Sequence, residues 1–518
     1  DGRQLTRRLA LPVQATDPEI TRQDRLVLDE GQTFTLDDNL FAGLQPGTGR
    51  ATMAIGPMAR LDVAGVMASL DLYPHGCTEQ ITSKAMPLLY LSDIARALDL
   101  PGTEALPERI GQAVAEVLTN QTAEGSFGLW RAGSGDFWLD AYVTDFLSRA
   151  KAQGFAVPDE PMRRALDNLR NQVNYAADFD QGGEALAYAL MVLAREGAAA
   201  IGDLRYYADV KGDAFTTPAA QAQLGAALAS YGDQLRADAM FRKAAARLNR
   251  DLAAAPAQLF RADYGTAHRD AAAVLTLAAE AGSAVVDREA VATALATRQG
   301  PLSTQEAAWT LLAANALIDR PDVAGVRIGG LPATGPLVRV LAAGAPPVAV
   351  ENDGPSQVLT LTTTGVPVTP EPAGGNGYAI KRSYFSMTGE ASDPARVTQG
   401  ARLVAVLEVT PFGDGGGRLI VTDPLPAGFE IDNPNLLRGG QVAALDWLET
   451  VEDTAHAEFR QDRFTVALDR MDGAPFRLAY VVRAVSPGRF HHAAAVVEDM
   501  YRPAFRAWTG AGTVTVAP

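Results

Sequence analysis

Hydrophobic and polar residues alternate one by one in the first part of the chain, residues 1–57. The segments RRLALPVQ (7–14) and QTFTLDD (32–38) follow this pattern, with Gly and Asp residues between them. Alternation with a period of two, bounded by turn residues, predicts β-strands. Residues 1–57 are too few for a comfortable sandwich of their own, so we expect these strands to pair with strands elsewhere in the chain.

From about Met58 to Leu317 the apolar residues recur at helical spacing instead. Eight segments place them at i, i+3 and i+4, as in amphipathic helices: 104–119, 139–150, 162–173, 184–197, 218–228, 235–248, 271–281 and 305–317. Many of these segments are rich in alanine, whose small side chain lets helices approach closely. A region of about ten or more short helices, counted by this periodicity, is typical of an α-hairpin array or a closed α/α toroid.

After Asp319 the strand pattern returns and continues to the last residue. Strand-like segments separated by Gly and Pro turns are VRIGGL, LVRVLAA, SQVLTLTTTGVPV, ARLVAVLEVT, RLIVTDPLPAGFEI, FRLAYVVRAV and GTVTVAP. They predict two or more antiparallel β units with a seam near residues 374–377 (GGNG). Because domains insert readily at exposed loop tips, we expect the helical region to be inserted in a β domain formed by residues on both sides of it.

Composition and charge narrow the class of protein. At 518 residues the chain is long enough for two to four domains. It is 47% hydrophobic and 20% charged, with a formal net charge of −16, and no segment supplies the basic face that a nucleic acid requires. No apolar run reaches the ~18 residues of a membrane span. The first residues lack an initiator Met and the apolar core of a signal peptide, so we expect a piece or processed form of a longer protein.

The single cysteine, Cys77, lies in the segment YPHGCTEQIT (73–82). One cysteine excludes an intrachain disulfide and a zinc site built from cysteines. A lone cysteine is often only a buried core thiol. Here, however, Gln80 follows three residues later, and residues three apart face each other on a helical turn. Pro74 and Gly76 precede a helix-like stretch, 81–98, which we expect Pro87 to kink.

A thiol and a carboxamide held together in this way can react with each other. A helix N-terminus lowers a thiol pKa, so we expect thiolate to be available at Cys77. Attack of that thiolate on the Gln80 side-chain carbonyl expels ammonia and leaves an internal thioester. A thioester acylates amines and hydroxyls far more readily than an amide does, and it persists only where packed side chains exclude water.

The stretch YPHGCTEQ resembles the thioester signature of the alpha-2-macroglobulin and complement family, in which Gly, Cys, any residue, Glu and Gln open a helix. GSFGLW (125–130) and FWLDAYVTDF (137–146) are similar to segments of that family's thioester domain. DPLPAGFE (423–430) and VVEDMYRPAFRAW (496–508) are similar to the C-terminal macroglobulin-like domain of the bacterial branch. The resemblance covers essentially the whole chain.

The resemblance implies a multidomain α and β fold. An α/α toroid, the thioester domain at 58–319, would be inserted in a CUB-like β domain made of 1–57 and 320–383. A macroglobulin-like antiparallel β-sandwich would fill 384–518.

Site roles follow from the resemblance residue by residue. Cys77 is implied as the thioester sulfur and Gln80 as the acyl donor; Glu79 matches the signature, but we assign it no chemical step. In the bacterial branch, aromatic and Met side chains of the C-terminal domain cover the thioester, and Met500 and Tyr501 occupy the matching motif. Tyr73, on the toroid side shortly before Cys77, is expected to shield the thioester as well. The alternative for Met500 and Tyr501 is an ordinary interdomain packing contact.

The implied function is protease trapping, as the C-terminal part of a bacterial alpha-2-macroglobulin. A target endopeptidase would be bound covalently through a lysine amine in a reaction that occurs once, and small amines such as methylamine would react in the same way. Family members that favour hydroxyl targets carry a helper histidine in the toroid. Neither His75 nor His268, the two histidines of the helical region, obviously occupies its place.

We therefore expect amide bonds to lysine, with no cofactor and no metal. The same resemblance implies a periplasmic protein of bacterial defence, attached to a membrane only through an N-terminal lipid anchor that this chain does not include.

Four other functions fit parts of the sequence. QTAEGSFGLW (121–130) is similar to the Gln-to-Trp repeat of terpene cyclases, which are also toroids, although DFDQ (178–181) only partly imitates their carboxylate cluster. Cys77 would be a conventional nucleophile if a histidine base such as His75 lay beside it. The chain would be an inert structural module if the thioester never formed, or a covalent adhesin if the thioester attached to host surfaces.

Overall fold

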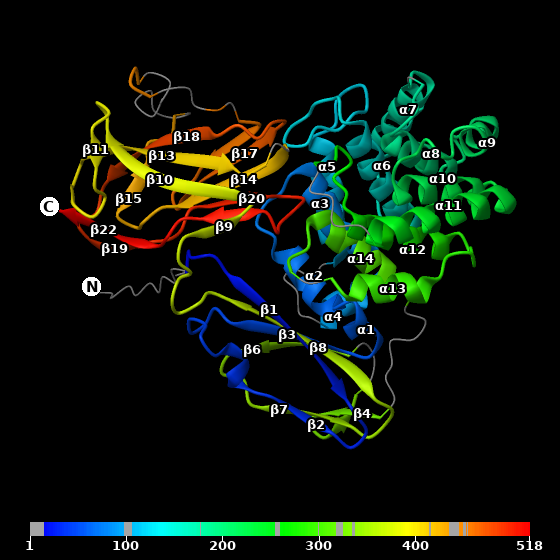
Figure 1. The fold of residues 1–518 in the computed structure, drawn as a ribbon, viewed down its shortest axis with the longest axis horizontal. Coiled ribbons are helices and arrows are strands. Elements are labelled where there is room, and N and C mark those ends of the chain that lie inside the picture. Colours follow the sequence, from blue (N-terminus) through cyan, green and yellow to red (C-terminus); the bar gives the residue numbers. More distant parts are fainter. Residues whose placement is uncertain are drawn as a thin grey trace, which may run out of the picture.

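Three domains meet at one junction in the computed structural model: a ring of helices, a β domain below it, and a β-sandwich beside both (Figure 1). The structure describes residues 15–97, 106–176, 178–253, 260–298, 300–317, 325–333, 337–413, 416–434, 445–448, 452 and 454–518. The strand predicted at 7–14 and the domain boundary predicted at 319/320 lie outside these residues.

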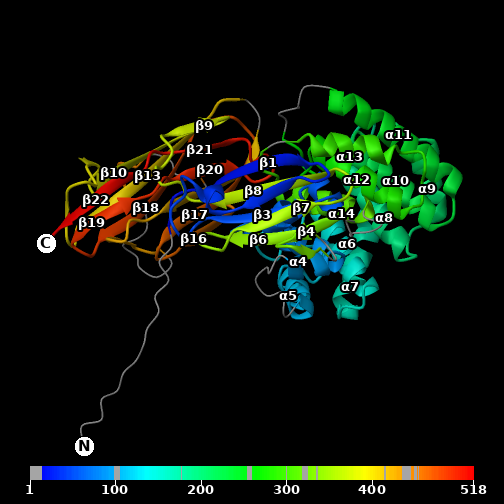
Figure 2. The ribbon, with the colours of Figure 1, turned by 90° about the horizontal axis from the view of Figure 1, so that it is seen from below.

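Strands from both sides of the helical region form one β domain. β1 (Ile20–Leu28) pairs along its whole length with β8 (Gln357–Gly365), and β3 (Arg50–Ile55) lies between β8 and β6 (Val338–Ala342). Figure 2 shows β1, β8 and β3 from below. The second sheet has the order β2 (Thr33–Leu36), β7 (Val348–Asn352), β4 (Val326–Ile328), β5 (Leu331–Pro332). Apolar side chains from both sheets fill the space between them. The prediction that the helical region is an insertion is confirmed.

The helical region is an α/α toroid. Its inner helices contact one another in the closed order α3 (Thr78–Ala85), α6 (Phe137–Ala152), α8 (Glu184–Arg195), α10 (Pro218–Ser230), α12 (Ala267–Glu280), α14 (Thr304–Leu317) and back to α3. Outer helices cover them: α2 (Val63–Leu72), α5 (Leu106–Thr119), α7 (Asp159–Asn174), α9 (Ile201–Asp209), α11 (Gln234–Ala253) and α13 (Arg288–Ala296). The short helices α1 (Pro57–Arg60) and α4 (Ser92–Ala97) complete the described helices of this domain.

The two layers differ in how much of each helix they bury. Inner helix α6 buries every residue from Trp138 to Ala150, whereas outer helix α7 buries only Met162, Ala165 and Leu169. Outer helix α9, which is not among the eight predicted segments, fully buries only Leu204, and Ile201 and Tyr207 are partly buried against the core. Small residues let the layers approach closely: a Cβ at Gly225 of α10 would lie 3.2 Å from the Ala237 carbonyl of α11.

The last domain is an antiparallel sandwich. One sheet has the order β11 (Ala391–Ser392), β10 (Tyr378–Ser386), β13 (Arg402–Pro411), β18 (Phe476–Ala484), β15 (Phe429–Ile431). The facing sheet has the order β16 (His456–Phe459), β17 (Arg463–Arg470), β14 (Gly417–Pro424), β20 (Val496–Asp499), β21 (Arg506–Trp508), β9 (Gly374–Asn376). A smaller sheet joins β12 (Val397–Thr398), β22 (Gly512–Ala517) and β19 (Gly488–His492).

The boundary predicted at 383/384 needs correction. It falls inside β10, which pairs with β13 from Tyr378 to Ser386. β9 also belongs to the sandwich, because Gly374 pairs with Trp508. The sandwich therefore begins at the GGNG segment, where the sequence indicated a seam.

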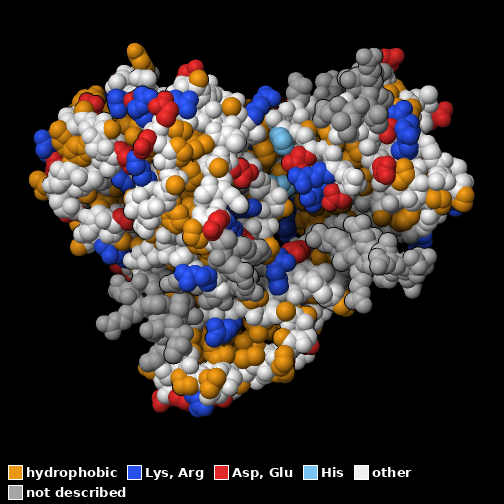
Figure 3. Space-filling model, turned by 180° about the vertical axis from the view of Figure 1, so that it is seen from behind, with side chains coloured by type: hydrophobic (Ala, Val, Ile, Leu, Met, Phe, Trp, Pro, Cys, Tyr) orange, Lys and Arg blue, Asp and Glu red, His pale blue; other side chains and the backbone are white. Residues whose placement is uncertain are grey.

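Seen from behind, the molecule has three lobes with a hollow where they meet (Figure 3). Among the residues that the structure describes, no helix is both long and apolar enough to cross a membrane.

Candidate functional site

Helix α3 begins at the centre of the junction, and Cys77 is its N-cap. The backbone of Cys77 is extended, with φ −73° and ψ 166°, and the helix starts at Thr78. Pro87 ends α3 and opens a single 3-10 turn before α4, because proline removes a backbone donor and clashes with the preceding helical turn. The expected interruption at Pro87 is confirmed, and the helix begins three residues earlier than the predicted 81.

Cys77 and Gln80 face each other across this helix end. The Cys77 backbone N–H donates to Gln80 Oε1 at 3.0 Å, and the Gln80 backbone N–H donates to the Cys77 side chain. Cys77 is 1% exposed, and Gln80 is fully buried. The carboxamide oxygen is thus held by a main-chain donor while the sulfur lies on the same turn, which is the reciprocal arrangement of a capping box.

The electrostatics of Cys77 differ from the expectation. Burial raises the pKa of the Cys77 thiol, and the neighbouring Glu79 carboxylate raises it further. Hydrogen bonds from the Gln80 and Glu79 backbone and from Tyr501 oppose this shift without reversing it. The predicted lowering of the thiol pKa is therefore wrong for this closed arrangement, because loss of solvation outweighs the helix end. The site favours an uncharged sulfur, as in a thiol or a thioester.

Two residues of the sandwich cover this helix end, and we call Met500 and Tyr501 the lid. Gln80 Nε2 lies 3.5 Å from Met500 Sδ, and the Tyr501 hydroxyl donates to Glu79 Oε2 at 2.8 Å. Met500 is 1% exposed and Tyr501 5%. The turn that carries them is shaped by Asp499, whose carboxylate accepts from the Tyr501 backbone N–H at 3.1 Å. The structure therefore places both predicted covering residues against the Cys77–Gln80 turn.

Tyr73, at the C-terminal end of α2, lies on the toroid side of the Cys77–Gln80 turn. Its hydroxyl is buried without a hydrogen-bond partner among the described residues, and its backbone carbonyl accepts from Lys84. Burial raises the pKa of Tyr73, and the charge of Glu498 adds to the shift. The ring packs edge-on against His75, with centroids 5.4 Å apart.

Glu79 is the residue whose structural importance the sequence did not reveal. Its carboxylate is fully buried and accepts hydrogen bonds from three elements. The donors are Ser83 Oγ of α3 at 2.5 Å, Thr304 Oγ1 at 2.9 Å and Gln305 Nε2 at 2.7 Å of α14, and the lid hydroxyl of Tyr501. Glu79 therefore joins the inner ring to the lid. The signature motif marked its position, but nothing along the chain indicated these partners.

A loop beneath the site fixes where α3 begins. The Thr78 backbone N–H donates to the Leu129 carbonyl at 2.8 Å, and Thr78 Oγ1 donates to the Gly128 carbonyl at 2.6 Å. The loop is itself held by Asp140 of α6, which accepts from the Phe127 N–H at 2.6 Å. GSFGLW and FWLDAYVTDF, two segments of the family resemblance, thus both support the helix end that carries Cys77.

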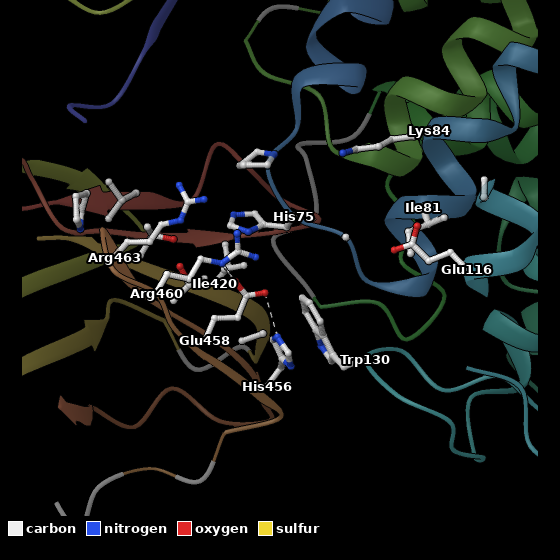
Figure 4. Close-up of a pocket in the computed structure, with 18 of the residues that line it drawn as sticks. His75, Ile81, Lys84, Glu116, Trp130, Ile420, His456, Glu458, Arg460 and Arg463 are labelled. Atoms are coloured by element: carbon white, nitrogen blue, oxygen red, sulfur yellow. Dashed lines mark hydrogen bonds and ion pairs between the residues drawn. The ribbon is translucent and has the colours of Figure 1, made fainter. Parts of the chain in front are cut away.

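A cavity of about 730 Å³ lies between the toroid and the sandwich, next to the segment that precedes Cys77. Figure 4 shows His75 and Trp130 on the toroid side facing His456, Arg460 and Arg463 of the sandwich. The rings of Trp130 and His456 stack at 4.7 Å and are nearly parallel. Burial lowers the pKa of His75 to about 4. Polar and apolar side chains both line the cavity, and most of them belong to the two domains that meet at the lid.

Two of the alternative functions find little support in this geometry. The contacts of Cys77 are with Gln80, Glu79 and Tyr501, whereas His75 packs on Tyr73. Asp178 of DFDQ lies at the surface, paired with Lys211 at 2.7 Å, and Gln121 bonds the Pro161 carbonyl at 3.0 Å. Within the described ranges, no group of three or more His, Cys, Asp or Glu side chains could hold a metal ion.

Two family models match the chain. One is described as an A-macroglobulin TED domain and matches residues 51–191, which include Cys77 and Gln80. The other is described as a bacterial alpha-2-macroglobulin MG10 domain and matches residues 377–504, which include the lid.

Two curated relatives, both named Alpha-2-macroglobulin, align with nearly the whole chain. Alpha-2-macroglobulin of Xylella fastidiosa (strain Temecula1) is 30% identical over 561 residues, which cover 100% of this chain and 33% of the relative. Alpha-2-macroglobulin of Escherichia coli (strain K12) is 29% identical over 93% of this chain and 31% of its own length. The chain therefore spans about a third of the length of these relatives.

Solved structures agree in fold. Native alpha-2-macroglobulin of Escherichia coli, from domain MG7 to the C-terminus, matches with a TM-score of 0.80 and 26% identity, covering 97% of this chain and 82% of that one. Salmonella alpha-2-macroglobulin reacted with methylamine matches with a TM-score of 0.83 and 29% identity, covering 97% of this chain and 34% of that one.

Proposed function

The chain belongs to the alpha-2-macroglobulin family, and we propose that it is the part of a bacterial member that traps endopeptidases covalently through a Cys77–Gln80 thioester. The observation that carries the proposal is the Gln80 carboxamide, enclosed between the Cys77 backbone N–H and the Met500 sulfur at a fully buried helix end. A buried glutamine whose side-chain oxygen accepts from the Cys77 backbone N–H, with the Cys77 sulfur on the same turn, is arranged for acyl transfer between Gln80 and Cys77.

Thioester formation requires only these two side chains. The Cys77 sulfur attacks the Gln80 Cδ atom, the C–N bond breaks, and the nitrogen leaves as ammonia with the thiol proton. During the attack the Gln80 oxygen gains negative charge, and the Cys77 backbone N–H at 3.0 Å is placed to stabilise that charge. Burial favours the neutral sulfur of the thioester over a free thiolate.

The trapping reaction reverses the roles of the two residues. A lysine amine of the target attacks the Gln80 acyl carbon, an amide bond forms, and Cys77 leaves as a thiol that keeps the proton lost by the amine. Each molecule reacts once. Small amines such as methylamine undergo the same reaction, and the methylamine-reacted Salmonella relative supports this choice of probe. We assign no step to a cofactor or a metal ion.

The closed lid sets the condition for this reaction. Met500 and Tyr501 are almost fully buried against the helix end, so a protein lysine reaches Gln80 only after the sandwich moves away from the toroid. In the proposed trap, cleavage of another part of the whole protein by the endopeptidase causes this movement. The trap acts in bacterial defence in the periplasm, and it contacts a membrane only through a lipidated N-terminus of the full-length protein.

Intact mass and thiol titration test the proposal. Fresh protein should be lighter than its sequence by the mass of one ammonia and should show no titratable thiol. Methylamine should then release one thiol and add its own mass at Gln80. Cys77→Ala should show the full sequence mass and no reaction with methylamine. A freely titratable Cys77 and an intact Gln80 in fresh protein would rule the thioester out.

Covalent trapping is tested with a matched pair of targets. An unmodified protease and the same protease with dimethylated lysines are each added under conditions in which the lid opens and exposes the thioester. The unmodified enzyme should form a covalent adduct that survives denaturation, and the dimethylated enzyme should not. Equal adducts with both would show that lysine amines are not the acceptors.

A further inference from the structure

Arg418 of strand β14 contacts the lid through its main chain and the toroid through its side chain. Its backbone carbonyl accepts from the Met500 N–H at 2.9 Å. Its guanidinium carbon lies 3.7 Å from the ring centroid of Tyr264, a residue of the loop that precedes α12. The same carbon is 5.9 Å from the centroid of Tyr501. One residue thus touches both lid residues and the opposite domain.

Tyr264 is unusually constrained. It is 1% exposed and has a φ of +56°, in the left-handed region that non-glycine residues rarely adopt. Its hydroxyl donates to the Asp136 carboxylate at the start of α6, and its ring meets Tyr501 edge-on at 4.7 Å. Backbone strain of this kind costs on the order of 1–3 kcal/mol and persists only where the surroundings fix it. The loop is fixed next to Tyr264 by Asp263, which binds Arg269 of α12 at 2.5 Å.

The Arg418 side chain is buried in a way that packing alone does not explain. It is 12% exposed, and its Nε and Nη1 atoms are buried without a hydrogen-bond partner among the described residues. The carboxylates of Asp136 and Asp469 are each 3.6 Å away, too far for good hydrogen bonds. Burial alone would lower the pKa of Arg418, but the neighbouring Tyr264, Tyr501, Asp136 and Asp469 together raise it above its ordinary value, so the closed arrangement favours the charged guanidinium. Moving the sandwich away from the toroid would separate Arg418 from Tyr264 and Asp136.

We propose that Arg418 is a positioning residue that fastens the Met500–Tyr501 lid to the toroid through Tyr264. This inference rests on the proposed function for its purpose and for the first of its two tests, whereas the second test does not depend on it. Attraction to Tyr264 holds the lid while the domains are in contact. When the domains separate, Arg418 leaves Tyr264 and Asp136, so this attraction favours only the closed position of the lid.

The first experiment measures which amines reach Gln80. Thiol release is followed with methylamine and with polylysine, in the unaltered chain and in Arg418→Gln, Arg418→Lys, Tyr264→Phe and the control Arg489→Gln, an exposed arginine of the same sandwich. A loosened lid admits the bulky amine. Arg418→Gln should raise the polylysine rate at least tenfold more than the methylamine rate, and Tyr264→Phe, which loses the Asp136 hydrogen bond, should do so to a smaller extent. Arg418→Lys keeps the charge and should recover most of the original ratio.

The second experiment needs no thioester. In a Gln80→Ala background, alkylation of Cys77 by iodoacetamide reports the lid directly, with and without Arg418→Gln. A faster alkylation with Arg418→Gln, at an unchanged circular dichroism spectrum, supports the inference. Equal alkylation rates, or an unchanged polylysine-to-methylamine ratio, would overturn it. A free thiol in the fresh unaltered chain would instead refute the proposed thioester, and the alkylation experiment would still decide the role of Arg418.

Discussion

Gln80 Nε2 lies 3.5 Å from the sulfur of Met500, a residue 420 positions further along the chain. The contact joins the first turn of α3, an inner helix of the toroid, to the turn after β20 of the sandwich. A soft thioether makes a weak hydrogen-bond acceptor but excludes water well. The pair therefore shields the carboxamide without holding it strongly.

Replacement of Met500 tests this shielding. Met500→Ala leaves a void over Gln80, and truncation of a buried methionine costs about 2–5 kcal/mol. Because that cost falls on the closed arrangement, we expect thiol release in water and in methylamine to accelerate at least tenfold, since about 1.4 kcal/mol corresponds to a factor of ten. Met471→Ala is the control, as Met471 is 77% exposed in the same domain. Equal rates for the two variants would mean that Met500 is only a packing residue.

The variant Glu79→Gln tests the hydrogen bonds that join the inner ring to the lid. A glutamine offers one acceptor oxygen where the carboxylate offers two, and its NH₂ group faces the hydroxyls of Thr304 and Tyr501. Leaving a buried donor unsatisfied costs about 1–3 kcal/mol. We expect a lower melting temperature together with faster thiol release. Glu124→Gln, at an exposed loop position, should change neither quantity. A lower melting temperature with an unchanged rate of thiol release would show that Glu79 stabilises the fold but does not hold the lid.

The sequence predicted the parts of this site that depend on local spacing. Cys77 and Gln80 are three residues apart, and the break at Pro87 follows from proline itself. The positions of Met500 and Tyr501 came from the family resemblance, and their shielding role remains a proposal. The partners of Glu79 and the pairing of Arg418 with Tyr264 join segments far apart in the chain, which one sequence does not reveal. The Cys77 pKa was predicted in the wrong direction because burial, a property of the whole fold, outweighs the helix end.

The lid strand also predicts a pH dependence. Burial raises the pKa of Glu498 to about 7. Arg506, which pairs with Glu498 from the neighbouring strand β21, opposes this shift, and the charge of Asp499 adds to it. In an open, solvated arrangement the pKa returns towards about 4.3. Protonated Glu498 therefore favours the closed lid. That advantage is complete below about pH 4 and is lost as the pH rises through about 7.

The measurement is thiol release without added amine, from pH 5 to pH 9, in the unaltered chain and in Glu498→Gln. Hydrolysis accelerates with pH in both. The rate of the unaltered chain divided by the rate of Glu498→Gln should rise most steeply near pH 7. Only the unaltered chain gains a buried charge next to Tyr73 and Asp499 as the pH rises. A ratio independent of pH would show that Glu498 does not influence the lid.

Formation of the thioester, as distinct from its protection, depends on the loop under α3. A Cβ at Gly128 would lie 1.9 Å from the Arg131 carbonyl oxygen, so Gly128→Ala must displace this backbone. The Gly128 and Leu129 carbonyls accept from Thr78, the first residue of α3, and a displaced loop moves the turn that aligns the Cys77 sulfur with Gln80. Gly133→Ala is a matched control in the same loop, because its Cβ would meet the same oxygen at an ordinary 3.6 Å.

We expect Gly128→Ala to yield mostly protein of full sequence mass with a free thiol, and Gly133→Ala to resemble the unaltered chain. Intact mass after rapid purification measures both. A displacement of even 1 Å is enough to suppress an acyl transfer that relies on alignment, by roughly a hundredfold. If Gly128→Ala formed the thioester completely, the Cys77–Gln80 alignment would not depend on this loop, and the geometry of the helix end alone would be sufficient for the reaction.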